Sequence, residues 1–159
     1  MTVLEHMKGM SPERFCALYR SLEHQGFGPL DADVARSLRF RPQAIRKLPM
    51  EQRAKRARMI IESTKNANLA YEIVGGYLMK TRKDLVVGFL DATGVKHENG
   101  MIEDIEGVKP ESAKIAEAVA ELDKKFPADD VTLYLVLCAE QWPDEKAFGK
   151  LLAGRVQAT

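Results

Sequence analysis

The stretch from Pro49 to Lys80 constrains the fold more than any other part of the chain, because it is long and contains no internal proline. As one uninterrupted helix it would extend about 46 Å. Its two halves differ in charge. The segment from Glu51 to Arg58 carries four cations, whereas the segment from Asn66 to Met79 contains one charged residue, Glu72.

Apolar side chains recur along this stretch at the spacing of one helix face. That stripe consists of Ala57, Ile60, Ile61, Thr64, Ala67, Tyr71, Val74 and Leu78. Four further apolar residues lie on other faces of the second half: Leu69, Ala70, Ile73 and Tyr77. A helix that is apolar on several sides is typical of the centre of a bundle, so we predict one long helix whose second half is enclosed by the rest of the chain.

Helix signals precede and follow this stretch. Ser11-Pro12 combines a capping hydroxyl with proline at the first helical position, and residues 31–48 predict two short helices joined by a bend. Pro110 and Asp144 each introduce a further helical pattern. Residues 131–139 are rich in β-branched and aromatic residues and are compatible with helix or strand, of which we favour helix because helical signals flank them.

One local signal favours β structure. Asn99-Gly100 is the dipeptide that suits a type I′ turn, and it lies between Val95-Lys96-His97-Glu98 and Met101-Ile102-Glu103-Asp104. We therefore predict a small β-hairpin here. Because two strands alone are only marginally stable, it should lie on the helices.

These patterns predict a mainly α fold, a compact multi-helix domain of six to eight helices with one long central helix and a small β-hairpin. At 159 residues with 45% hydrophobic content, residues 1–159 are expected to form a single domain. No apolar run is long enough to cross a bilayer, and no secretory signal is evident. Two widely separated cysteines favour a reduced, cytoplasmic protein.

The net charge of +1 conceals a strong asymmetry along the chain. Residues 36–58 hold nine Lys or Arg and one acidic residue, a balance of +8. Residues 84–145 hold fifteen acidic and five basic residues, a balance of −10. Either the basic segment binds an external polyanion, or the two halves attract each other within one molecule or between subunits.

The basic cluster is the main candidate for a nucleic-acid or partner-binding site. Its members are Arg36, Arg39, Arg41, Arg46, Lys47, Arg53, Lys55, Arg56 and Arg58. If these residues share one surface, they would attract the phosphates of a nucleic acid electrostatically. That attraction depends on salt concentration and does not depend on base sequence. The alternative is an ordinary solvated surface, since Glu51 stands four residues before Lys55 for a helix ion pair, and only Phe40 offers base stacking.

Motifs for catalysis and cofactor binding are absent from the sequence. The three histidines show no metal-ligand spacing with one another or with cysteine, and there is no nucleophile elbow, phosphate loop or dinucleotide fingerprint. We expect no cofactor. The predicted hairpin gathers one histidine and four acidic residues: His97, Glu98, Glu103, Asp104 and Glu106. The carboxylates could hold a hard cation or could form a solvated rim.

Two charged residues fall on or beside the apolar stripe. Glu72 is either buried with a partner or partly exposed at the edge of the stripe. Arg53 is either on a protruding helix end or paired with a carboxylate.

The leading functional hypothesis is a non-enzymatic cytoplasmic interaction module, self-associating through complementary basic and acidic surfaces. Its partner is expected to be another protein or a second copy, with no membrane involved. The first alternative is nucleic-acid binding through residues 36–58. The second alternative is a cation-binding protein or an enzyme that uses the hairpin carboxylates.

Overall fold

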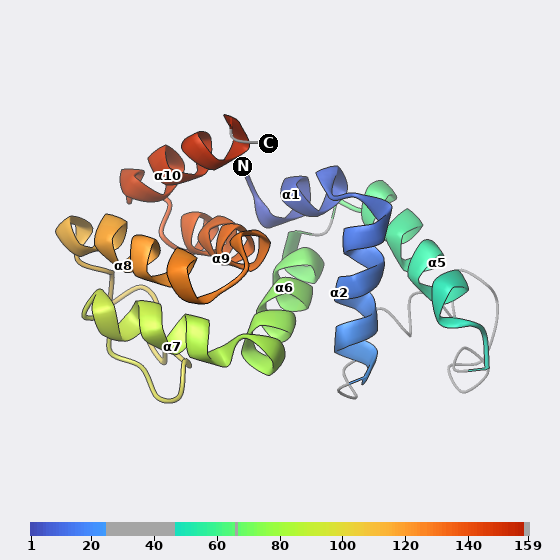
Figure 1. Ribbon diagram of the computed structural model, residues 1–159, viewed down its shortest axis with the longest axis horizontal. Coiled ribbons are helices and arrows are strands. Elements are labelled where there is room, and N and C mark those ends of the chain that lie inside the picture. Colours follow the sequence, from blue (N-terminus) through green and yellow to red (C-terminus); the bar gives the residue numbers. More distant parts are fainter. Residues whose placement is uncertain (25–46, 66, 158–159) are drawn as a thin grey trace. The chain divides into compact units, whose positions relative to one another are not determined.

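Helices form every regular element of the residues that the computed structural model describes, which are 1–24, 47–65 and 67–157 (Figure 1). Their bounds are α1 Val3–Gly9, α2 Pro12–His24, α5 Met50–Ser63, α6 Ala67–Thr81, α7 Lys83–Ala92, α8 Ser112–Lys125, α9 Ala128–Gln141 and α10 Lys146–Gln157. The mainly helical fold class is confirmed, and residues 131–139 are helical. The predicted short helices of residues 31–48 fall almost wholly outside the described residues.

The chain forms two compact units. The N-terminal unit comprises residues 3–77, and the C-terminal unit comprises residues 78–159 together with the first two residues. Helix α6 begins in the N-terminal unit and ends in the C-terminal unit. Whether residues 1–159 behave as a single domain stays a prediction.

In the N-terminal unit, α2 packs against α5. The hydroxyl of Ser11 accepts a hydrogen bond from the Arg14 N–H at 3.1 Å, so the predicted start of α2 is confirmed. Helix α2 buries an apolar face made of Phe15, Leu18, Tyr19 and Leu22. Facing residues of α5 are small or aliphatic, namely Ala54, Ala57 and Ile61, all buried, which lets the two helices approach closely.

The single long helix was a wrong prediction, because the stretch divides into α5 and α6. Thr64 takes extended backbone angles, φ −75° and ψ 151°, and its carbonyl accepts a hydrogen bond from Lys8 Nζ at 2.8 Å. The hydroxyl of Ser63 donates to the Ile60 carbonyl, which competes with continued helix. The break therefore combines weak helix formers with a contact from α1.

The second half of that stretch is helical from Ala67, as predicted. Ala70, Ile73, Val74 and Tyr77 are buried, whereas Glu72 is exposed, so the interpretation of Glu72 as an edge residue is confirmed.

The core of the C-terminal unit is built on Phe89 of α7. Its ring meets Tyr134 of α9 edge-on at 5.3 Å between centroids and Phe148 of α10 at 6.0 Å. Trp142 stacks on Phe148 at 6.2 Å. Aromatic pairs of this kind stabilise beyond their area of burial, and here they join three helices.

The predicted β-hairpin is not supported, because the described residues contain no strand. Glu98 and Met101 form one isolated bridge, with reciprocal backbone hydrogen bonds of 2.8 and 2.9 Å. Asn99 and Gly100 have positive φ of 53° and 86°, as a type I′ turn requires. The flanking chain bonds elsewhere: the Val95 N–H donates to the Leu90 carbonyl, and the Glu111 N–H donates to the Thr93 carbonyl.

An ion pair with a buried carboxylate links α7 and α9. Arg82, at the N-cap of α7, places its Nε 2.7 Å from Asp130 Oδ2, and Asp130 is only 2% exposed. A carboxylate this deep requires cationic and hydrogen-bonding partners, because desolvation penalises its charged form.

We expect Arg82→Leu to lower the free energy of unfolding by about 2 kcal/mol, because it removes the ion pair that Arg82 makes with the buried carboxylate of Asp130. Urea unfolding followed by circular dichroism measures the change. The control is Lys83→Leu at the exposed neighbouring position, expected to have an effect below about 0.5 kcal/mol. Equal effects of the two substitutions would contradict the assignment.

Candidate functional site

The segment of residues 96–109 in the C-terminal unit, called here the 96–109 loop, is the best candidate site. Its ends are drawn together because the hydrogen bonds of Val95 and Glu111 fix them to the end of α7. Compact surface loops of this length with adjacent ends are frequently functional. The loop carries four exposed carboxylates, on Glu98, Glu103, Asp104 and Glu106.

His97 fixes the first part of the loop. Its Nδ1 accepts a hydrogen bond from the Gly100 N–H at 2.9 Å, so the neutral ring carries its proton on Nε2, which lies 2.6 Å from Asp91 Oδ1. The side chain of His97 is 10% exposed. Both ring nitrogens are engaged, which suits a structural role in holding the turn better than proton transfer.

The end of the loop rests on Trp142. Its indole Nε1–H donates to the Val108 carbonyl at 2.9 Å, while its ring stacks on Phe148 in the core. Within the loop, Asp104 Oδ1 accepts the Gly107 N–H at 3.0 Å. The loop is therefore held by side chains at both ends and in its middle.

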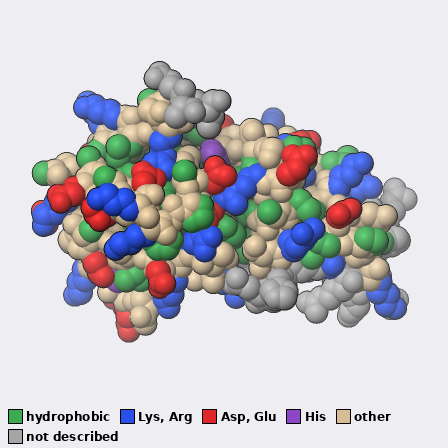
Figure 2. Space-filling model, in the orientation of Figure 1, with side chains coloured by type: hydrophobic (Ala, Val, Ile, Leu, Met, Phe, Trp, Pro, Cys, Tyr) green, Lys and Arg blue, Asp and Glu red, His purple; other side chains and the backbone are tan. Residues whose placement is uncertain are grey.

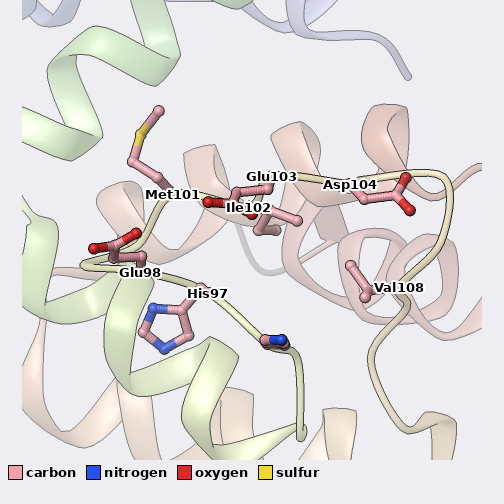
Figure 3. A pocket seen from close by; sticks show the side chains of 8 residues that line it. His97, Glu98, Met101, Ile102, Glu103, Asp104 and Val108 are labelled. Carbon is pink, nitrogen blue, oxygen red and sulfur yellow. The ribbon is translucent and has the colours of Figure 1, made fainter.

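Two hollows flank the loop and share Val108. One, of about 330 Å³, is lined by loop residues from Lys96 to Val108 (Figure 3). The other, of about 600 Å³, lies between residues 105–109 and residues 141–145. Acidic side chains line both, Glu103 and Asp104 in the first and Asp144 and Glu145 in the second.

Exposed apolar side chains lie among the acidic side chains of the 96–109 loop. Met101 is 60% exposed and Ile105 is 39% exposed, whereas most large apolar side chains of the described residues are buried. Figure 3 shows Met101 and His97 on opposite sides of the loop. The surface thus offers apolar contact area beside negative charge, a combination that suits a protein partner.

The carboxylates of the loop do not converge. Figure 3 shows Glu98, Glu103 and Asp104 at separate positions along the chain. Among residues 1–24, 47–65 and 67–157, no three His, Cys, Asp or Glu side chains are grouped as metal ligands. Within the same part of the chain, no helix combines the length and apolar character that spanning a bilayer requires.

Five of the nine predicted basic residues are described by the structure, and they do not share one exposed face. Arg53 is 8% exposed, Lys47 and Lys55 are exposed, and Arg56 and Arg58 are half-buried. The remaining four lie outside the described residues: Arg36, Arg39, Arg41 and Arg46. Binding of nucleic acid or a partner by this set stays a prediction.

The two units differ in net charge. The N-terminal unit holds thirteen Lys or Arg and eight Asp or Glu, a balance of +5, and the C-terminal unit holds eleven and fifteen, a balance of −4. On the face drawn in Figure 2, basic and acidic side chains are interspersed. The difference between units is therefore one of net charge, without a patch of a single sign on that face.

Sequence reasoning missed the role of Trp142 and the second hollow. One signal was present in the sequence: the apolar residues Met101, Ile102 and Ile105 stand among the acidic residues of 101–106, and this mixture does not fit a purely solvated rim.

Comparison of this chain with protein-family models, with curated proteins and with solved structures finds no match.

Replacing Trp142 by Phe keeps an aromatic ring on Phe148 and removes the hydrogen bond to the Val108 carbonyl. We expect the free energy of unfolding to fall by about 1 kcal/mol and amide exchange of residues 101–109 to accelerate more than that of α8. Hydrogen exchange followed by mass spectrometry measures this difference. Uniform acceleration over both segments would show that the bond does not hold the loop in particular.

The pKa of Glu145 is lowered by a hydrogen bond from the Ser112 hydroxyl and, next, by the Ala147 N–H. A glutamate whose pKa is lower in the folded state stabilises the fold at pH values above its unfolded-state pKa, which is about 4.3. This stabilisation is lost as the pH falls through the folded-state pKa. We expect Ser112→Ala to raise the pKa of Glu145 and to reduce the loss of stability between neutral pH and about pH 3. Carbon-detected NMR titration with urea unfolding at both pH values tests this; an unchanged pKa would contradict it.

Proposed function

We propose that this protein is a non-enzymatic interaction module that binds a basic protein surface through the 96–109 loop. The observation that carries the proposal is the placement of exposed Met101 and Ile105 among exposed carboxylates, in a loop whose backbone is fixed at both ends. A fixed loop loses little conformational entropy on binding, so more of the contact energy remains as affinity.

Apolar and acidic groups have different roles in this proposal. Burying Met101 and Ile105 supplies the apolar contribution, roughly 25 cal/mol for each Å² removed from water, and the thioether of Met adapts to irregular partner surfaces. The carboxylates select basic partners and accelerate their encounter, an effect that salt weakens. Lys96 and Lys109 mark the two ends of the loop, so its negative charge is concentrated between them.

A second copy of the chain is the partner that this proposal favours. The N-terminal unit has a balance of +5, and its helix α5 exposes Lys55 and Met59 one turn apart, with Met59 48% exposed. That pairing of positive charge with an exposed methionine complements the loop. Contact between two unlike surfaces of identical chains builds rings or open chains.

Light scattering across ionic strength tests this function. Wild-type protein is expected to exceed the monomer mass at low salt and to approach it as salt rises. The variant Glu103→Gln with Glu106→Gln is expected to stay closer to the monomer mass at low salt. The matched control Glu117→Gln with Glu121→Gln removes the same charge from exposed positions of α8 and should behave as wild type.

A second arm separates partner binding from self-association. A fluorescent amphipathic peptide of lysine and leucine should bind the wild type and the control, and bind the loop variant at least several-fold more weakly. Peptide binding with a monomeric wild type would support an interaction module whose partner is another protein. Monomeric wild type without peptide binding at low salt would overturn the proposal.

A further inference from the structure

His97 holds the 96–109 loop through a hydrogen bond that depends on the protonation state of its ring. The Gly100 N–H can only donate, so the Nδ1 that accepts it at 2.9 Å carries no proton. The other ring nitrogen, Nε2, lies 2.6 Å from Oδ1 of Asp91, near the end of α7. The neutral ring therefore joins the loop to the helix, with its single proton directed at Asp91.

A second proton on this ring would act in opposite ways on the two bonds. It would make Nδ1 a donor that faces the donor N–H of Gly100, so that hydrogen bond would be lost. The contact with Asp91 would become an ion pair and would strengthen. Protonation thus keeps the ring on α7 and removes its attachment to the turn.

The charged groups around the ring are mostly acidic. Asp91 faces it from α7. The charged loop residues that line the same hollow as the ring are Lys96, Glu98, Glu103 and Asp104 (Figure 3). The side chains of α6 and α7 that lie against the turn, Met79 and Val86, are apolar. A positive ring is therefore favoured by its charged neighbours, and the cost of protonation falls on the Gly100 hydrogen bond.

Gly100 is the point at which the turn rests on the helices. Its φ is 86°, and a Cβ added there would lie 3.1 Å from Met79 Cε and 3.5 Å from Val86 Cγ1. Without the hydrogen bond to His97, the turn keeps only the reciprocal backbone bonds between Glu98 and Met101. Loosening the turn therefore also loosens the position of Met101, the residue after Gly100.

We infer that His97 is a pH-sensitive switch, whose protonation below neutral pH releases the Gly100 turn from the end of α7. Histidine is the side chain that ordinarily gains a charge between pH 8 and 5. Release of the turn follows from the two bonds of the ring alone. Its effect on partner binding rests on the proposed function, because that function uses the exposed side chain of Met101.

NMR of the imidazole nitrogens and backbone amides at pH 7.5 and 5.5 tests the switch. At pH 7.5, His97 is expected to carry its proton on Nε2, and the Gly100 amide is expected to be protected from exchange. At pH 5.5, the ring is expected to be mostly cationic. The protection factor of Gly100, which allows for the intrinsic pH dependence of exchange, should then fall by about fivefold or more. The Val95 amide, which donates to the Leu90 carbonyl, is the internal reference and should keep its protection.

Three variants make the test specific to His97. His97→Asn supplies an amide oxygen that can accept a nearby backbone N–H and gains no proton in this pH range, so exchange at Gly100 should show no such loss of protection. His97→Ala removes the acceptor, so the Gly100 amide should be poorly protected at both pH values. The control His6→Asn, in α1, should respond to pH as the wild type does. Circular dichroism verifies that all three are folded.

Three results would overturn the switch: a His97 ring that stays neutral at pH 5.5, a cationic ring with Gly100 still protected, or an equal pH response of His97→Asn and wild type. The effect on binding is measured with the fluorescent lysine–leucine peptide. Wild type is expected to bind it about threefold or more weakly at pH 5.5 than at pH 7.5, and His97→Asn to bind it with little change. Equal binding by wild type at the two pH values would overturn the link to the binding surface. Absence of peptide binding at pH 7.5 would contradict the proposed function, while the exchange of Gly100 would still decide the switch.

Discussion

The hydrogen bond from the Trp142 indole to the Val108 carbonyl connects the core of the C-terminal unit to its candidate site. The indole belongs to the aromatic cluster of Phe89, Tyr134 and Phe148, so its position is set by close packing. Its N–H is aimed at the backbone of a surface loop. The buried ring of Trp142 thereby positions the 96–109 loop, most of whose side chains are exposed.

Much of the helical architecture follows from local sequence. The Ser11-Pro12 start and the apolar faces of α2 and α8 all appear in the structure, because capping chemistry and helical periodicity act within a few residues. Helix α9 is a harder case, since Val131, Leu133 and Val136 would suit a strand equally well. This segment packs against α8 and α10, which favours helix. The described residues contain no strand that could pair with it.

The two wrong predictions both arose where a hydrogen bond to a residue outside the predicted element decided the outcome. Nothing between Pro49 and Lys80 demanded a break, but Thr64 is extended and its carbonyl is bonded by Lys8, fifty-six residues earlier. At the turn, Asn99-Gly100 adopts the predicted backbone, yet His97 and Val95 direct their hydrogen bonds toward Asp91 and Leu90 instead of a strand ladder. The acidic charge of the site was readable from the sequence, but its hollows were not, because they depend on how separate loops approach.

The opposite balances of the two units, +5 and −4, have a consequence for handling the protein. Retention on an ion-exchange resin depends on local charge at the surface that meets the matrix, and the near-zero total conceals that local charge. Near neutral pH, the N-terminal unit carries a net positive charge and the C-terminal unit a net negative charge. At low ionic strength the chain should therefore adsorb to cation and anion exchangers alike, and elute from both in moderate salt.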